Sequence, residues 1–166
     1  MAITLYLVRH GETEENARGV FQGQTAGTLS EIGKEQAKAI REKLANIPFD
    51  IVLSSDLKRC IDTASIALEG ISCEIIKEPL LRERDLGNLT GKQIKGATLN
   101  DTVESEDSLK VRANKFIDKI KKEYADKKIL AFSHGFFARV MQAELEGVTY
   151  KEVTLLDNCE IRKFNI

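Results

Sequence analysis

Histidine, cysteine, proline and tryptophan are scarce in this sequence, and their scarcity excludes several kinds of site. The 166 residues include 2 histidines, 3 cysteines, 2 prolines and no tryptophan. Two widely separated histidines without a paired-cysteine motif argue against a zinc site, and no metal or cofactor is implied. The cysteines are odd in number and lie in or beside apolar segments. Cys60, Cys73 and Cys159 are therefore predicted to be reduced, partly buried thiols.

Long apolar runs and an excess of one charge are also missing. No run reaches the roughly 20 apolar residues of a membrane helix, and the amino terminus lacks the pattern of a signal peptide. A net charge of −1 gives no broad field for holding nucleic acid, so neither membrane nor nucleic acid is an expected partner. With 42% hydrophobic and 31% charged residues, residues 1–166 are predicted to form one cytoplasmic globular domain of unknown oligomeric state.

Strands and helices are predicted to alternate along the chain. Apolar runs indicate strands near 3–9, 50–53, 74–77, 129–133 and 160–164. Helical spacing of apolar residues indicates one helix from a Ser30 cap to about Ile47, one over 57–68 capped by Ser55 or Asp56, and two more over 109–120 and 137–145. Residues 13–29 are predicted to form a loop, and 79–107 to be mostly irregular. This order predicts an α/β fold, a three-layer α/β/α sandwich with a mostly parallel central sheet.

Both histidines stand in the same local setting. His10 follows the apolar run 3–8 and Arg9, His134 follows the run 129–132 and Ser133, and a glycine comes directly after each. Open parallel sheets bind ligands at the carboxyl ends of their strands, so the two imidazoles are predicted to share one pocket.

Other phosphate chemistries lack their usual motifs. Glu35 and Gln93 stand where a nucleotide-binding loop needs serine or threonine after its glycine and lysine. No cysteine has an arginine six residues later, and no two aspartates are separated by one residue. The nucleophile that remains is histidine itself.

Ordered segments that together cover nearly the whole chain resemble the histidine phosphatase superfamily in its phosphoglycerate-mutase-like branch. The first is the opening signature, and the later ones include an acid segment and a second histidine segment. The matching residues are Leu7, Val8, Arg9, His10, Gly11, Glu12, Thr13, Glu14, Glu15 and Asn16; Phe21, Gln22 and Gly23; Leu29, Ser30, Gly33, Gln36 and Ala37; Ser54, Ser55, Asp56, Leu57 and Arg59; Leu81, Arg82, Glu83, Arg84 and Gly87, with a shorter motif at Glu104 and Ser105; and Ser133, His134, Gly135 and Arg139.

The same residues suit phosphoryl transfer. A phosphate dianion needs an in-line nucleophile and positive donors around its oxygens, and the guanidinium groups of Arg9 and Arg59 provide such a clamp. Their charge should keep His10 neutral and nucleophilic, so that attack gives a phosphohistidine. The resemblance implies that His134 donates to the phosphoryl group and that Glu83 is the general acid and base. The expected substrate-binding residues are Arg9, Asn16, Gln22, Gly23, Arg59, His134 and Gly135.

Simpler explanations compete with some of these roles. Charged neighbours surround Glu83, so its segment could instead be a surface loop of ion pairs. Gly23 could serve only to make a turn. Of the two phenylalanines after Gly135, Phe136 is expected to flank the site and Phe137 to lie in the core.

Departures from the family pattern bear on the substrate. Glu15 replaces a common tryptophan, Val20 replaces a common arginine, and Asn88, Leu89 and Thr90 replace an acidic and aromatic stretch, so the entrance should be less aromatic and less basic. The segment after Gly91 is short, which predicts a short lid insertion, and the chain stops after its last strand. These features favour a phosphatase acting on a small phosphorylated metabolite. A cofactor-dependent phosphoglycerate mutase and a binding module without turnover are the alternatives, and sugar phosphates, phosphoglycerate, ribazole phosphate and phosphoserine all stay open as substrates.

Overall fold

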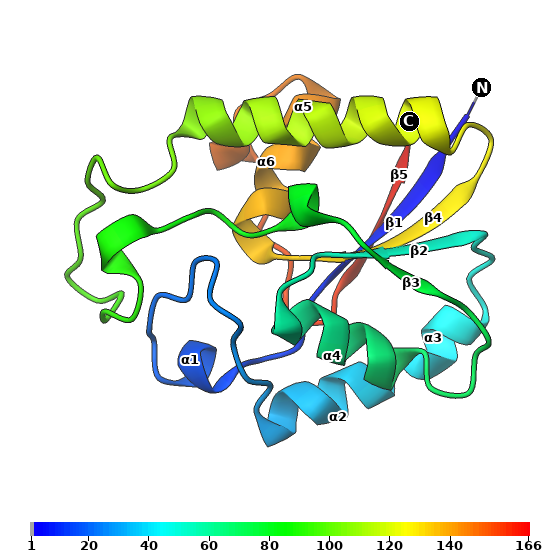
Figure 1. Ribbon diagram of the computed structural model, residues 1–166, viewed down its shortest axis with the longest axis horizontal. Helices are drawn as coiled ribbons and strands as arrows, with labels where there is room; N and C mark the ends of the chain where they lie inside the picture. Colours follow the sequence, from blue (N-terminus) through cyan, green and yellow to red (C-terminus); the bar gives the residue numbers. More distant parts are fainter. Residues whose placement is uncertain (1) are drawn as a thin grey trace.

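A computed structural model describes residues 2–166 and contains five strands and six α-helices within them (Figure 1). The strands alternate with helices as the sequence pattern predicts. In chain order the elements are β1 (Thr4–Arg9), α1 (Glu14–Ala17), α2 (Glu31–Ala39), α3 (Arg41–Ala45), β2 (Ile51–Ser54), α4 (Lys58–Ala67), β3 (Ile75–Lys77), the 3-10 turns η1 (Pro79–Leu81) and η2 (Gly87–Leu89), α5 (Glu106–Glu123), β4 (Lys128–Ser133), α6 (Gly135–Glu146), η3 (Tyr150–Glu152) and β5 (Ile161–Asn165).

The sheet has the strand order β3-β2-β4-β1-β5, and every neighbouring pair is parallel except β1 with β5. The predicted mostly parallel α/β fold is therefore confirmed. β1 and β4 lie side by side at the centre, with Arg9 opposite Ser133 in the register. The amide of His10 donates to the carbonyl oxygen of Ser133 at 3.1 Å. This pairing brings the two histidine segments together although they are far apart in sequence.

Helices cover both faces of the sheet, because residues of the central strands alternate between two apolar cores. Ile129 and Ala131 of β4 belong to the core beneath α5 and α6, whereas Leu130 and Phe132 belong to the core beneath α2 and α4. Figure 1 shows these two helical layers above and below the sheet. None of the helices within residues 2–166 combines the length and apolar character needed to span a bilayer.

Neither of the two residues expected to cap the helix that follows β2 does so. The N-cap of α4 is Leu57, which has no side-chain cap bond. The Ser55 hydroxyl lies 2.8 Å from Nε2 of His134, and the Asp56 carboxylate accepts from Nε of Arg82 at 2.7 Å. Both side chains are engaged with residues of other segments, so the cap prediction was wrong.

Three further expectations need correction. The single helix expected from Ser30 to about Ile47 is two helices that meet at Ile40, and Ile40 and Leu44 are both buried. The predicted loop over 13–29 contains the short helix α1. Cys73 is exposed, because it lies in the connection between α4 and β3, beyond the apolar face of the helix; Cys60 and Cys159 are buried and all three thiols are free.

Candidate active site

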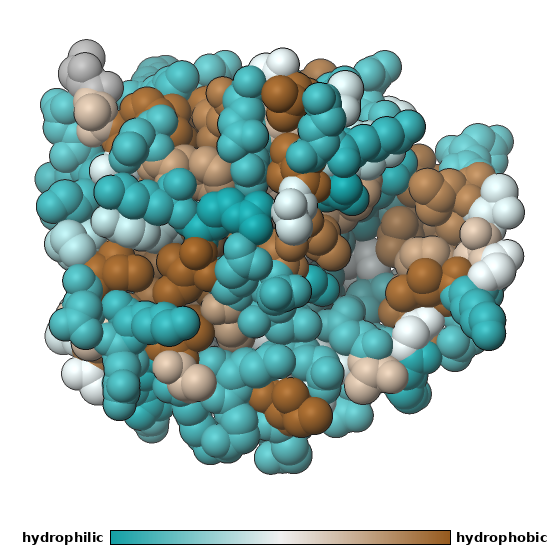
Figure 2. Space-filling view, turned by 180° about the vertical axis from the view of Figure 1, so that it is seen from behind, coloured by the Kyte–Doolittle hydropathy of each residue, from teal (hydrophilic) through white to brown (hydrophobic). Residues whose placement is uncertain are grey.

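A cavity of about 300 Å³ lies at the carboxyl end of β1. On the reverse face of the molecule, Figure 2 shows a hollow between the body and a lobe rich in apolar side chains. The cavity brings together most of the residues singled out from the sequence. Its lining consists of Arg9, His10, Asn16, Val20, Phe21, Gln22, Gly23, Arg59, Glu83, Arg84, Leu86, Ile94, Leu99 and Phe136. His134 and Gly135 are not in this lining and lie behind it.

A hydrogen bond at one ring nitrogen of His10 fixes the tautomer and leaves the other nitrogen unprotonated. Its Nδ1 lies 2.7 Å from the carbonyl oxygen of Gly11, which can only accept, so Nδ1 carries the proton and Nε2 keeps its lone pair. The main chain around the ring is also fixed. The amide of Gly11 donates to the Thr63 hydroxyl at 3.0 Å, and the side chain of Asn158 donates to the carbonyl oxygen of His10 at 3.0 Å. His10 therefore presents a basic, unprotonated nitrogen at a fixed place.

Both histidines are held in their neutral form. Burial lowers the pKa of His10 from its ordinary value of 6.5 to about 3, and the positive charge of Arg59 contributes next. Burial and the same guanidinium hold the pKa of His134 well below its ordinary value. The sequence predicted the direction for His10 from the arginines alone, whereas burial is the larger cause.

Acid should destabilise the protein through these buried imidazoles. Below pH 6.5 the unfolded chain gains protons that the folded chain cannot take up until its lower pKa is reached, so stability falls as pH falls through that window. For His10 the loss between pH 7 and pH 5 is about 2 kcal/mol. Urea unfolding at both pH values should therefore show that the free energy of unfolding falls less for His10→Asn than for the unchanged protein. Carboxylate contributions cancel in this difference, and equal losses would contradict the lowered pKa of His10.

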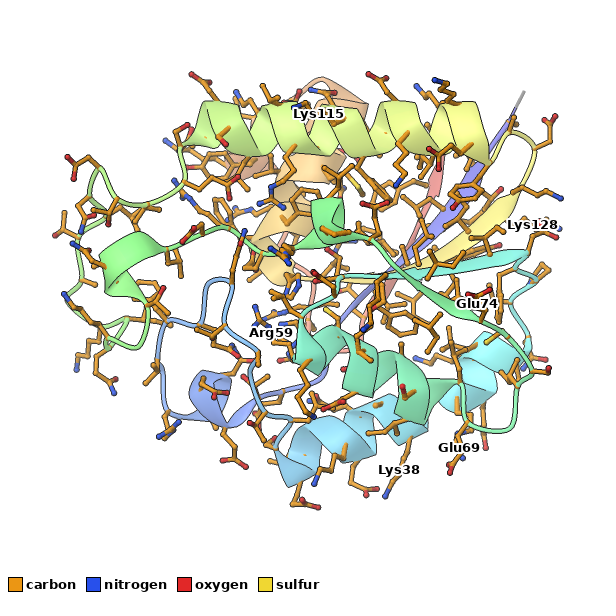
Figure 3. All side chains as sticks on the ribbon, in the orientation of Figure 1. Lys38, Arg59, Glu69, Glu74, Lys115 and Lys128 are labelled. Carbon is orange, nitrogen blue, oxygen red and sulfur yellow. The ribbon has the colours of Figure 1, made fainter. Side chains whose placement is uncertain are left out.

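Arg9 and Arg59 each leave a buried nitrogen without a partner. Nη1 of Arg9 donates to the carbonyl oxygen of Leu156 at 2.6 Å, and the two Nη atoms of Arg59 donate to those of Thr25 and Gly23 at 2.5 and 2.8 Å. Nε of both arginines is buried and has no hydrogen-bond partner within residues 2–166. Figure 3 shows Arg59 at the amino end of α4 inside the molecule, while the other labelled charged residues lie at the periphery. Two buried guanidinium groups that line one cavity suit an anion.

His134 lies behind His10 in a fully buried position. The two rings meet edge to face with their centroids 5.3 Å apart. Nε2 of His134 lies 2.8 Å from the Ser55 hydroxyl and 3.4 Å from the Cys60 sulfur. Burial raises the pKa of the Cys60 thiol, and this thiol donates to the carbonyl oxygen of Ser133 at 3.3 Å. Cys60 is therefore a packing residue behind the second histidine, and not a thiolate.

The carboxylate of Glu83 is held at the amino end of α6. Its Oε1 accepts from the amides of Arg84 and Phe137, both at 2.9 Å, and its Oε2 accepts from the amide of Phe136 at 3.1 Å. No ion pair joins Glu83 to another side chain in the described part of the chain, so the surface-loop alternative is wrong for this residue. Oε2 has a single partner and keeps the lone pair that could carry a proton into the cavity.

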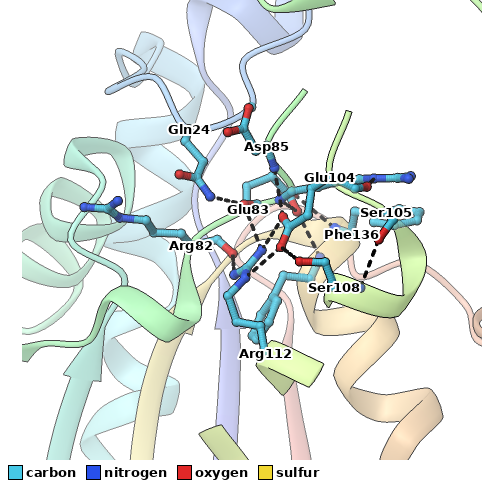
Figure 4. Close-up of polar contacts among 12 residues, drawn as sticks. Gln24, Arg82, Glu83, Asp85, Glu104, Ser105, Ser108, Arg112 and Phe136 are labelled. Atoms are coloured by element: carbon cyan, nitrogen blue, oxygen red, sulfur yellow. Dashed lines mark hydrogen bonds and ion pairs between the residues drawn. The ribbon is translucent and has the colours of Figure 1, made fainter. Parts of the chain in front are cut away.

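Arg112 of α5 holds the main chain on which Glu83 stands (Figure 4). Its Nη1 donates to the carbonyl oxygens of Leu80 and Arg82, and its Nη2 donates to that of Glu83 at 3.2 Å. The carboxylate of Glu104 accepts from Nε and Nη2 of the same guanidinium at 3.1 and 2.8 Å. The segment carrying Glu83 has little regular structure of its own, so this clamp defines where the acid stands.

The remaining predicted residues surround the two histidines. The Asn16 side chain accepts from the Thr13 amide at 3.2 Å and so completes the capping box at the start of α1. The Gln22 side chain accepts from the Thr13 hydroxyl at 2.9 Å. Gly23 has φ of +53°, which supports the turn as well as the lining role. A Cβ on Gly135 would lie 3.1 Å from Nε of Arg9, so this glycine leaves room for the guanidinium rather than lining the cavity.

Two glycines let the nucleophile loop approach α2. A Cβ on Gly11 would lie 2.6 Å from the carbonyl oxygen of Gly33, and one on Gly33 would lie 2.0 Å from that of Glu12. The main chain after His10 therefore packs directly on the first turn of α2, with no side chain between them.

The sequence reasoning missed Arg112 and the apolar mouth of the cavity. Arg112 lies three residues after Leu109 and four before Phe116, on the buried face of α5, and an arginine at such a position is a detectable signal for an interior role. Ile94 and Leu99 come from an irregular segment with no periodic pattern, so no comparable signal was present.

A mostly parallel sheet ending in two adjoining histidines, with two buried arginines beside them, defines an α/β protein with a cavity suited to a small anion. The chain belongs to the histidine phosphatase superfamily (branch 1), whose sequence profile matches residues 5–166.

Relatives in this family carry the names of phosphatases and of a mutase. The chain is 36% identical to the metal-independent phosphoserine phosphatase of Arabidopsis thaliana, over 86% of this chain and 71% of that protein. It is 40% identical to the "Probable phosphoglycerate mutase GpmB" of Proteus mirabilis (strain HI4320), over 62% of this chain and 47% of that protein, and so spans about half of that relative's length. A solved structure of a phosphoserine phosphatase mutant from Entamoeba histolytica, in complex with phosphoserine, matches with a TM-score of 0.85 and 25% identity over 98% of this chain and 90% of that chain.

Proposed function

We propose that this protein is a metal-independent phosphatase that hydrolyses a small phosphate monoester through a phosphohistidine on His10. The observation that carries the proposal is the free Nε2 of His10 in a cavity that the guanidinium groups of Arg9 and Arg59 also line. These groups would donate to a phosphate dianion, and burial makes the attraction stronger than in water. The names of the phosphatase relatives support the same reaction class.

In the first half-reaction, Nε2 of His10 attacks phosphorus while the bond to the leaving oxygen breaks. Arg9 and Arg59 stabilise the charge on the equatorial oxygens, and Asn16 adds a neutral hydrogen bond. The family resemblance gives His134 the role of a further ring N–H donor to this phosphoryl group, and for this its ring must turn from the Ser55 hydroxyl. Glu83, protonated beside the bound dianion, gives its Oε2 proton to the departing alkoxide, which leaves as an alcohol.

In the second half-reaction, Glu83 works in reverse. Its carboxylate removes a proton from water, the water oxygen attacks phosphorus, and the bond between phosphorus and His10 breaks to release inorganic phosphate. His10 returns with its Nε2 lone pair, and Glu83 returns with its proton. The amides of Phe136 and Phe137 keep the carboxylate in one place through both steps.

A phosphoglycerate mutase is the second candidate, and the relatives named as GpmB favour it. A mutase must keep water away from its phosphohistidine until the second phosphoglycerate reacts. In this chain the mouth residues Ile94 and Leu99 are 47% and 52% exposed, which suits access of water and therefore hydrolysis.

Phosphate release in the presence of a metal chelator tests the proposal. The panel is 4-nitrophenyl phosphate, phosphoserine, 3-phosphoglycerate and ribazole phosphate, and we expect release from at least one of them with no loss on chelation. Across residues 2–166, no group of three or more His, Cys, Asp or Glu side chains is arranged to bind a metal ion. Phosphoglycerate interconversion faster than phosphate release, with 2,3-bisphosphoglycerate as primer, would establish the mutase instead.

A further inference from the structure

The cavity has a polar floor and an apolar mouth. Its floor holds the two arginines, His10 and Glu83, as described above. Its mouth is formed by six apolar side chains from three separate segments, and none of them takes part in the proposed phosphoryl transfer. These residues are Val20, Phe21, Leu86, Ile94, Leu99 and Phe136.

One wall of this mouth is a fixed structure rather than a loose loop. The amide of Phe21 donates to the carbonyl oxygen of Lys92 at 2.9 Å, and the amide of Gly91 donates back to that of Phe21 at 2.8 Å. The amide of Ile94 donates to the carbonyl oxygen of Gly19, also at 2.9 Å. The segments 19–21 and 91–94 are thus joined by main-chain bonds, and they present their apolar side chains at a defined place.

Among the residues that the structure describes, Arg84 is the one charged side chain of the mouth itself. Its Nε donates to the carbonyl oxygen of Glu104 at 2.7 Å, and its guanidinium lies over the Phe136 ring at 5.1 Å. The carboxylate of Glu83 lines the cavity next to it. A second carboxylate or phosphate on the substrate would meet mostly apolar groups and the acid Glu83 here, and Arg84, whose Nε is already paired, is the one cation that could offset its lost hydration.

We propose that the mouth is a subsite for an apolar leaving group, an aryl or branched alkyl body joined to the phosphate through a short chain. This inference rests on the proposed function, because the phosphate must occupy the floor for its ester group to reach the mouth. The aromatic rings of Phe21 and Phe136 can pack against a substrate ring, while Ile94 and Leu99 are exposed and become covered when the ring binds.

Matched phosphonates test the subsite without requiring turnover. 2-Phenylethylphosphonate and 3-phosphonopropionate share an ethylphosphonate core and differ in a phenyl or a carboxylate group. By calorimetric titration the phenyl compound should bind about 30- to 100-fold more tightly than ethylphosphonate, because its ring is buried. The carboxylate compound should bind no better than ethylphosphonate. Equal affinities for all three, or a preference for the carboxylate, would overturn the subsite.

Measurements of turnover distinguish a failure of the proposed subsite from a failure of the proposed function. 2-Phenylethyl phosphate should have a kcat/KM about 30- to 100-fold above that of ethyl phosphate and should exceed that of phosphoserine. Phosphate release without this preference overturns the subsite and leaves the phosphatase standing. Absence of release from every ester overturns the proposed function, and the phosphonate affinities then decide on the subsite alone.

Substitution of the exposed mouth residues tests whether these side chains form the subsite. In the double variant Ile94→Ser with Leu99→Ser, the affinity ratio between the phenyl and carboxylate phosphonates should fall about tenfold. Ile32 on α2 is 60% exposed and does not line the cavity, so Ile32→Ser is the matched control and should keep the ratio. An unchanged ratio in the double variant would contradict the proposal.

Discussion

Replacing His10 with alanine is expected to lower kcat for phosphate release by about 10⁴-fold or more, because the variant has no nitrogen that can accept the phosphoryl group. The arginines would still bind the substrate, so affinity for a phosphonate should be largely kept. The measurement is steady-state phosphate release, with an acid quench of the unchanged protein to trap phosphate on histidine.

His10→Gln is the matched control for this loss. Glutamine fills much of the same buried space without offering a nucleophilic ring nitrogen, so it should be as inactive as alanine while unfolding at a similar urea concentration to the unchanged protein. Phosphate release above about one per cent of normal in either variant would rule out a phosphohistidine on this residue.

Glu83→Gln is expected to separate the two half-reactions. The amide oxygen of glutamine can replace Oε1 and still accept from the amides of Arg84 and Phe137, so the side chain should stay in place although its NH2 group cannot accept from the amide of Phe136. It can neither give a proton to an alkoxide nor take one from water, and turnover of alkyl phosphates should fall by about 10²- to 10⁴-fold. With 4-nitrophenyl phosphate the leaving group needs no proton, so one equivalent of nitrophenolate should appear in a fast burst before a slow steady state.

An exposed carboxylate provides the comparison for Glu83→Gln. Glu35→Gln on α2 makes the same chemical change at the surface and should have no effect on either substrate. A Glu83 variant that loses activity equally with alkyl and nitrophenyl esters, and shows no burst, would contradict a role in proton transfer.

The central fold could be predicted from the sequence because each element has its own periodic signal. The apolar run before each histidine fixed β1 and β4, and the alternation of strands with amphipathic helices predicted a sheet covered on both faces. The caps of α4 could not be predicted in the same way. Ser55 and Asp56 have the chemistry of N-cap residues, but His134 and Arg82, both distant in sequence, compete for them in the folded chain.

The candidate site likewise has a part that the sequence predicts and a part that it does not. Arg9, His10 and Arg59 occupy positions that motif and strand end define locally, and the structure brings all three to one cavity. Apart from Phe136, the apolar mouth comes from irregular segments, and the main-chain bonds that join 19–21 to 91–94 leave no mark in composition or spacing. Arg112 could have been singled out from the apolar face of its helix, but its partners are carbonyl oxygens, which every sequence contains.

The contact between Gly11 and Gly33 affects how tolerance to mutation should be interpreted in this protein. Neither glycine lines the cavity, yet any side chain at either position would separate the loop after His10 from the first turn of α2. In a complete substitution map both positions would rank beside the catalytic residues. Loss of activity on substitution at these two sites would result from the close approach of two main-chain segments and not from a role of either residue in catalysis.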